Sequence, residues 1–176
     1  RSFFIGGGAY TLPRLWASHF PSGRHTVSEI DPAVTQIAID HMWFKPHPSV
    51  EIIHQDARRI LQNQPREPLF DVIVGDAFHD ISVPAHLVTA EFASEVAVRL
   101  SEYGVYILTI IDTRREPAFL LAQVRTLSES FPAVEVWSDD TVRVLYQFEP
   151  LAPPTFTAQC LVLLLETSGL RSLFEQ

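Results

Sequence analysis

A glycine-rich turn near the start of the chain limits its possible folds more than any other feature. The apolar run 3–5 leads into three consecutive glycines at 6–8, and a helical pattern begins at Tyr10. Glycine adopts backbone conformations that other residues avoid, so such a turn can be sharp and can approach a ligand closely. A strand, a glycine turn and a helix in this order are typical of the first unit of a nucleotide-binding α/β sheet. The alternative is a tight turn without a ligand, since Thr11 stands where a G-x-G-x-x-G motif has its third glycine.

Strand-like and helical segments alternate through the first 130 residues. We expect strands at 3–5, 25–30, 50–53, 69–74 and 105–111, and helices at 10–19, 32–46, 57–62, 90–100 and 117–130. This alternation predicts an α/β fold with a mostly parallel, twisted sheet and helices on both faces. After residue 132 the pattern changes to strand-like segments at 134–137, 142–148 and 160–165, which predicts an antiparallel C-terminal strand.

Local signals place the second helix. Asp31 followed by Pro32 is typical of a helix start, with an N-cap carboxylate and a proline in the first turn. We expect this helix to end near residues 45–46 and to turn inward Val34, Ile37, Ala38 and His41.

The composition indicates a globular protein with neither a nucleic-acid nor a membrane partner. A length of 176 residues favours a single domain over residues 1–176, and a net charge of −8 argues against a basic nucleic-acid-binding face. The apolar run 161–165 is too short to span a membrane. The single cysteine, Cys160, excludes an internal disulfide, and we expect a cytoplasmic protein. Because the chain opens directly in a strand, we also expect that an N-terminal segment is missing.

Acidic residues follow three successive predicted strands. Glu29 follows the second strand, Asp56 the third and Asp76 the fourth. Ligands of open α/β sheets bind beyond the carboxyl ends of the strands, so we expect the three carboxylates to converge on one site.

Each carboxylate suits a different part of a nucleoside ligand. Glu29 lies about twenty residues past the glycines, the usual distance for a carboxylate that accepts the ribose hydroxyls; Asp31 competes for this role, although N-capping already explains it. Asp56 suits the exocyclic amine of an adenine, with the Ala57 N–H beside it, and an N-cap role is compatible with this.

The fourth strand brings a carboxylate to the reacting edge of the site. Asp76 can orient or deprotonate an amine there, and Asp80 is a weaker partner. The alternative is that Asp76 is a turn residue ahead of Phe78.

Other catalytic patterns are missing from the sequence. The seven histidines show no metal-ligand spacing, so we expect no metal and interpret each histidine as exposed or satisfied. No G-x-S-x-G nucleophile motif is present, and Cys160 lies within an apolar run.

Five segments occur in the order found in a known family. They are Ile5-Gly6-Gly7-Gly8, Val27-Ser28-Glu29-Ile30-Asp31-Pro32, Gln55-Asp56-Ala57, 71–78 and 87–92. In these segments the chain resembles the catalytic domain of spermidine synthases, polyamine aminopropyltransferases with the Rossmann-like class I S-adenosylmethionine-dependent methyltransferase fold. The stretches 6–14 and 82–87 are most similar to the branch often fused to transporter segments.

The resemblance implies a ligand of the S-adenosylmethionine kind, intact or decarboxylated, and a small cationic amine such as putrescine as acceptor. It implies that the glycines line the sulfur side, that Glu29 holds the ribose, that Asp56 holds the adenine and that Asp76 assists the attacking amine. Tyr10 and Asp80 are the candidate substrate contacts, and we also expect a homodimer.

Three departures from the family weaken the prediction of aminopropyl transfer. Spermidine synthases carry an aspartate directly after the three glycines and then a glycine, where this chain has Ala9 and Tyr10. Asp80 lies four residues after Asp76 instead of three, and we expect the family's N-terminal β-domain to be absent from this chain. The alternatives are a methyltransferase with an unknown small acceptor, a non-catalytic nucleoside-binding or dimerisation module, and a nicotinamide-dependent dehydrogenase, which does not explain acids at three strand ends.

Overall fold

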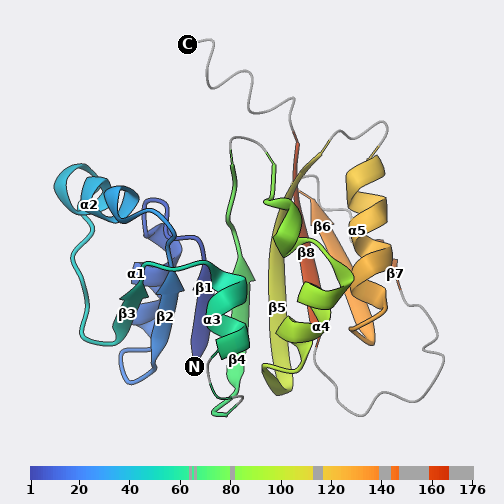
Figure 1. Ribbon diagram of the computed structural model, residues 1–176, viewed down its shortest axis with the longest axis horizontal. Helices are drawn as coiled ribbons and strands as arrows, with labels where there is room; N and C mark the ends of the chain where they lie inside the picture. Colours follow the sequence, from blue (N-terminus) through green and yellow to red (C-terminus); the bar gives the residue numbers. More distant parts are fainter. Residues whose placement is uncertain are drawn as a thin grey trace, which may run out of the picture.

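A computed structural model describes residues 1–63, 65, 67–79, 82–112, 117–138, 144–146 and 159–166. Within these ranges eight strands form one sheet in the order β3-β2-β1-β4-β5-β8-β6-β7 (Figure 1). The strands are β1 (Ser2–Ile5), β2 (His25–Ser28), β3 (Val50–Ile53), β4 (Phe70–Gly75), β5 (Leu100–Asp112), β6 (Ala133–Ser138), β7 (Val144–Tyr146) and β8 (Gln159–Glu166). The helices are α1 (Thr11–His19), α2 (Pro32–His41), α3 (Ala57–Asn63), the short 3-10 helix η1 (Ala85–Leu87), α4 (Ala90–Ala97) and α5 (Ala118–Ser128).

The described sheet is parallel except at one edge. Every neighbouring pair is parallel apart from β6 and β7, which pair antiparallel. The prediction of a mostly parallel α/β sheet with an antiparallel C-terminal strand is therefore confirmed. The antiparallel strand is β7, whereas β8 lies between β5 and β6 and runs parallel to both.

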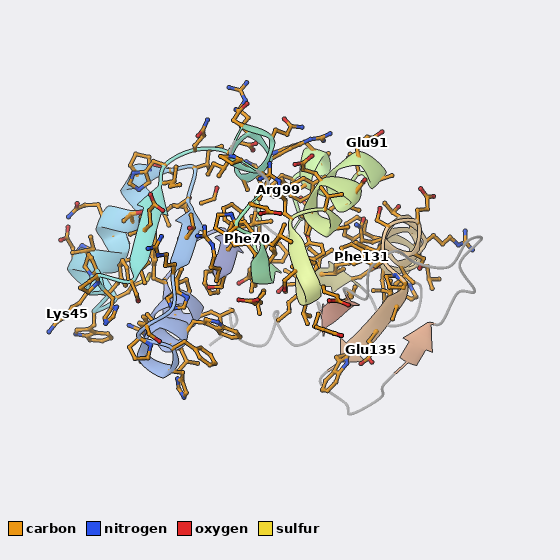
Figure 2. All side chains as sticks on the ribbon, turned by 90° about the horizontal axis from the view of Figure 1, so that it is seen from below. Lys45, Phe70, Glu91, Arg99, Phe131 and Glu135 are labelled. Atoms are coloured by element: carbon orange, nitrogen blue, oxygen red, sulfur yellow. The ribbon has the colours of Figure 1, made fainter. Side chains whose placement is uncertain are left out.

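The sheet separates two hydrophobic cores because side chains alternate along each strand. In β1, Phe3 and Ile5 belong to the core under α3, α4 and α5, and Phe4 belongs to the core shared with α1 and α2. Figure 2, seen from below, shows α3, α4 and α5 on one side of the sheet and α1 on the other. A strand covered on both faces has no solvent side, and all four residues of β1 are buried.

The second helix begins where the sequence predicts but ends four residues early. The Asp31 carboxylate accepts a hydrogen bond from the Ala33 N–H at 2.8 Å, which confirms the N-cap. The helix stops at His41 because Trp43 adopts a left-handed conformation with φ of 55°. This turn returns the chain to the core, where the ring of Phe44 stacks on Tyr10 with centroids 4.2 Å apart.

The inward face of α2 differs from the expected one. Ala38 and the neighbouring Thr35 are buried, whereas His41 is exposed and Ile37 is 48% exposed. The expectation for Ile37 and His41 was wrong. The small side chains face inward, where Thr35 forms a hydrogen bond to the buried Tyr10.

No helix in the described ranges is both long enough and apolar enough to cross a bilayer.

Candidate functional site

A cavity of about 810 Å³ lies at the carboxyl ends of the strands on the N-terminal side of the sheet. Six of the residues that the sequence singles out line it: Gly6, Gly8, Glu29, Asp56, Ala57 and Asp76. They come from the four segments that directly follow β1, β2, β3 and β4, with Ala57 as the first residue of α3. The three carboxylates that are far apart in the sequence therefore meet in one space, as the strand-end pattern predicts.

The glycine turn has a shape that side chains would obstruct. Gly6 has a φ of 97° and Gly8 a φ of 49°. A Cβ atom on Gly6 would lie 2.8 Å from the backbone oxygen of Asp76, which is closer than real Cβ contacts. The Asp76 N–H in turn donates to the Ile5 carbonyl at 3.0 Å. The end of β1 and the end of β4 can approach this closely only with glycine at position 6.

Glu29 is buried beneath the glycine turn, with 7% of its surface exposed. Its Oε2 accepts the N–H of Gly7 at 2.9 Å and the N–H of Gly8 at 3.4 Å. Its Oε1 accepts the N–H of Asp31 at 3.0 Å. A carboxylate has about four acceptor positions, so one remains for a ligand hydroxyl at the cavity wall. Glu29 thus fixes the turn and faces the same cavity that the turn lines.

Asp56 lies between the start of α3 and η1. Its Oδ1 accepts the Arg59 N–H at 3.0 Å, so it caps α3 as the sequence allows. Its Oδ2 lies 2.7 Å from the Nε2 of His86, which lines the same cavity. His86 is thus half-exposed and hydrogen-bonded, in line with the interpretation of the histidines, but the sequence analysis did not pair it with Asp56. Thirty residues separate the pair, so no spacing rule could find it; the only signal was that His86 falls within a family-like stretch.

Asp76 directly follows β4 and lines the cavity beside Gly6. Loss of hydration raises the pKa of its carboxyl above the ordinary value, and a hydrogen bond with Thr109 of β5 works in the opposite direction. A carboxylate with a raised pKa accepts a proton more readily near neutral pH, which suits a general base.

Of the two predicted substrate contacts, the structure describes only Tyr10, which does not line the cavity. The Tyr10 side chain is fully buried between α1 and α2, with its hydroxyl 2.6 Å from the Thr35 hydroxyl. This burial raises its pKa, and its ring stacks on Phe44 instead of lining the cavity. Tyr10 therefore packs the core, because its left-handed backbone (φ of 55°) turns the ring inward. Asp80 lies outside the described residues.

A smaller cavity of about 310 Å³ adjoins the first on the other side of the glycine turn. Both cavities are lined by Gly6, Gly8 and Asp76, and Ala9 and Leu12 contribute to the smaller one. Within the described lining of the smaller cavity, Asp76 provides the only carboxylate. An ammonium group there would meet one acidic partner.

The described part of the chain contains no cluster of side chains that could bind a metal ion. No three His, Cys, Asp or Glu side chains lie close enough together there to hold an ion.

Comparisons with known proteins agree with the geometry. No family model matches the chain. The chain is 32% identical over 116 residues to the polyamine aminopropyltransferase of Vibrio vulnificus strain CMCP6, a match that covers 65% of the chain and 39% of that protein. The chain therefore spans about two fifths of the length of this relative.

Two solved structures share the fold. A probable spermidine synthase from Corynebacterium glutamicum superposes with a TM-score of 0.67 and 27% identity, over 76% of the chain and 47% of that protein. Human methyltransferase-like protein 13, solved in complex with SAH, superposes with a TM-score of 0.69 over 88% of the chain and 74% of that protein. At 22% identity the human protein shows the shared fold alone. The resemblance to the spermidine synthase-like family is confirmed, together with the class I methyltransferase fold.

Proposed function

We propose that this spermidine synthase-like chain binds decarboxylated S-adenosylmethionine and transfers its aminopropyl group to a small amine such as putrescine. The observation that supports this most strongly is the meeting of Glu29, Asp56 and Asp76 in one cavity beside the glycine turn. The aminopropyltransferase activity of the Vibrio vulnificus relative supports the same reaction, although the chain spans only part of that protein.

Each carboxylate has a role that its position supports. Glu29, buried and fixed by backbone N–H groups, would accept a ribose hydroxyl with its remaining acceptor position. Asp56, whose carboxylate lines the same cavity from the start of α3, would accept the adenine amine, with the Ala57 N–H beside it. Gly6, Gly7 and Gly8 allow the backbone to approach the sulfur end closely.

Asp76 would act on the nucleophile. The amine attacks the carbon beside the sulfonium, so a C–N bond forms while the C–S bond breaks. The sulfur leaves as neutral methylthioadenosine, and the carboxylate of Asp76 accepts the proton that the amine loses. Its raised pKa supports this role, and alignment of the two substrates would supply much of the rate acceleration.

The reaction is tested with purified protein, decarboxylated S-adenosylmethionine and putrescine, with methylthioadenosine as the measured product. We expect turnover by the wild type. We expect Asp76→Asn to lose at least a hundredfold in turnover, in line with the loss of a general base, while nucleoside affinity in calorimetry stays nearly unchanged. Absence of methylthioadenosine from the wild-type reaction would overturn aminopropyl transfer, and a collapse of affinity in Asp76→Asn would make Asp76 a ligand-binding or structural residue.

A methyltransferase acting on a small acceptor is the second candidate. Ala9 favours it, because it lines the smaller cavity where spermidine synthases have a carboxylate. This candidate predicts that intact S-adenosylmethionine binds more tightly than the decarboxylated form. Calorimetry with both compounds separates the two reactions, and binding of either without turnover would indicate a nucleoside-binding module. The cytoplasmic location and the homodimer stay predictions.

A further inference from the structure

We infer that His86 is a positioning residue that holds the Asp56 carboxylate in place for the base of an adenosyl ligand. This inference rests on the proposed nucleoside site and adds to it a residue that the sequence pattern passed over. Asp56 and His86 both line the 810 Å³ cavity, and they also line a neighbouring cavity of about 540 Å³ on the outer side of α3. The pair therefore forms part of the wall between the two spaces.

The contact has a defined direction. A carboxylate oxygen can only accept, so the hydrogen in the 2.7 Å contact lies on Nε2 of His86. With Oδ1 fixed by the Arg59 N–H and Oδ2 fixed by His86, the carboxylate is held at both oxygens. About two of its four acceptor positions stay open, enough for an N–H of an exocyclic amine. His86 thus orients Asp56 without using its capacity to bind a base.

A side chain of α3 also contacts the backbone of His86. Arg58 donates from Nη1 to the His86 carbonyl at 2.9 Å and reaches the Thr89 hydroxyl at 3.4 Å. Arg58 therefore binds the carbonyl of His86, and Asp56 binds its ring. This places the ring at the cavity wall although 49% of the side chain is exposed to solvent.

The contacts of Asp56 differ from those of Glu29 in a way that makes His86 necessary. Glu29 is held by three backbone N–H groups that the fold supplies. Asp56 accepts a backbone N–H at Oδ1, and His86 contacts Oδ2. Without His86 the described contacts no longer hold Oδ2, so the carboxylate can rotate about its Cβ–Cγ bond. A carboxylate that rotates loses part of the orientation that an amine donor requires.

The experiment compares S-adenosylhomocysteine with its inosine analogue, in which a carbonyl replaces the adenine amine, by calorimetry on the whole chain. For His86→Ala we expect S-adenosylhomocysteine affinity to fall about three- to tenfold, the range for losing one hydrogen bond. We expect the inosine analogue to change less than twofold. His86→Gln keeps an N–H donor, so we expect it to restore most of the lost affinity.

His41→Ala is the matched control, since His41 is an exposed histidine at the end of α2. Equal weakening of both ligands by His86→Ala, failure of His86→Gln to recover affinity, or an effect as large in His41→Ala would each overturn the inference. Absence of S-adenosylhomocysteine binding by the wild type would instead count against the proposed nucleoside site, so the two failures are distinguishable.

Discussion

The two sides of the cavity hold their carboxylates in different ways. On the side of β1 and β2, Glu29 is buried and accepts the backbone N–H groups of Gly7, Gly8 and Asp31. On the side of α3 and η1, Asp56 depends in part on the half-exposed His86 ring. The backbone donors to Glu29 are placed by the loops that follow β1 and β2, whereas a side-chain donor can be changed without unfolding the protein. Mutations on the first side should therefore affect stability and binding together, and those on the second side should separate them.

The largest expected effect is at the glycine turn. Gly6→Ala combines a left-handed backbone with a Cβ only 2.8 Å from the Asp76 carbonyl, so we expect a loss of about 2–5 kcal/mol in unfolding free energy. Gly8→Ala has open space around its Cβ, and we expect a loss of about 1–2 kcal/mol from backbone conformation alone. Urea unfolding of both variants measures the two losses in unfolding free energy. Equal losses would show that the close contact between the ends of β1 and β4 does not add to the destabilisation by Gly6→Ala.

Glu29→Ala should come next. It leaves the N–H groups of Gly7, Gly8 and Asp31 without this acceptor, and we expect unfolding free energy to fall by about 1–3 kcal/mol. Nucleoside binding should be lost with it. Glu51→Ala, an exposed glutamate on β3, is the control, with an expected change within about 0.5 kcal/mol. If Glu29→Ala unfolds like the control, the turn does not depend on the carboxylate.

Thr89→Ala tests the other side of the cavity. The Thr89 hydroxyl accepts the Phe92 N–H at 3.2 Å and caps α4 directly after η1. We expect a loss of about 1 kcal/mol in unfolding free energy, typical of an N-cap threonine. Ser94→Ala, exposed within α4, should change stability by less than about 0.5 kcal/mol. A Thr89→Ala variant as stable as Ser94→Ala would mean that the cap contributes nothing.

The smallest effect concerns Asp76 and pH. Its pKa is raised in the folded protein above the ordinary value of 3.8, so ionisation of this carboxyl favours unfolding. This penalty is complete above the folded-state pKa, shrinks as the pH falls below it, and is gone only below the lower pKa of the unfolded chain. We therefore expect Asp76→Asn to raise Tm slightly at pH 7, with a gain that shrinks as the pH is lowered towards 4. Calorimetric scans across this range check the sign, and a gain that grows on acidification would contradict it.

Much of the fold follows from the sequence because its signals are local. The glycine turn and the Asp31-Pro32 helix start depend on residues within a few positions of one another, and the structure contains both. The convergence of Glu29, Asp56 and Asp76 was also predictable, because parallel strands present their carboxyl ends at one edge.

The rest depends on contacts between distant parts of the chain. The end of α2 was missed because Phe44 returns to stack on Tyr10, and that same stacking removes Tyr10 from the cavity. His86 was missed because its partner lies thirty residues away, across the space between α3 and η1. The sequence by itself determined which residues gather at the sheet edge, since strand periodicity and turn chemistry act over a few residues. Only the tertiary structure decided which side chains hold those residues in place, since packing brings together groups whose separation along the chain carries no signal.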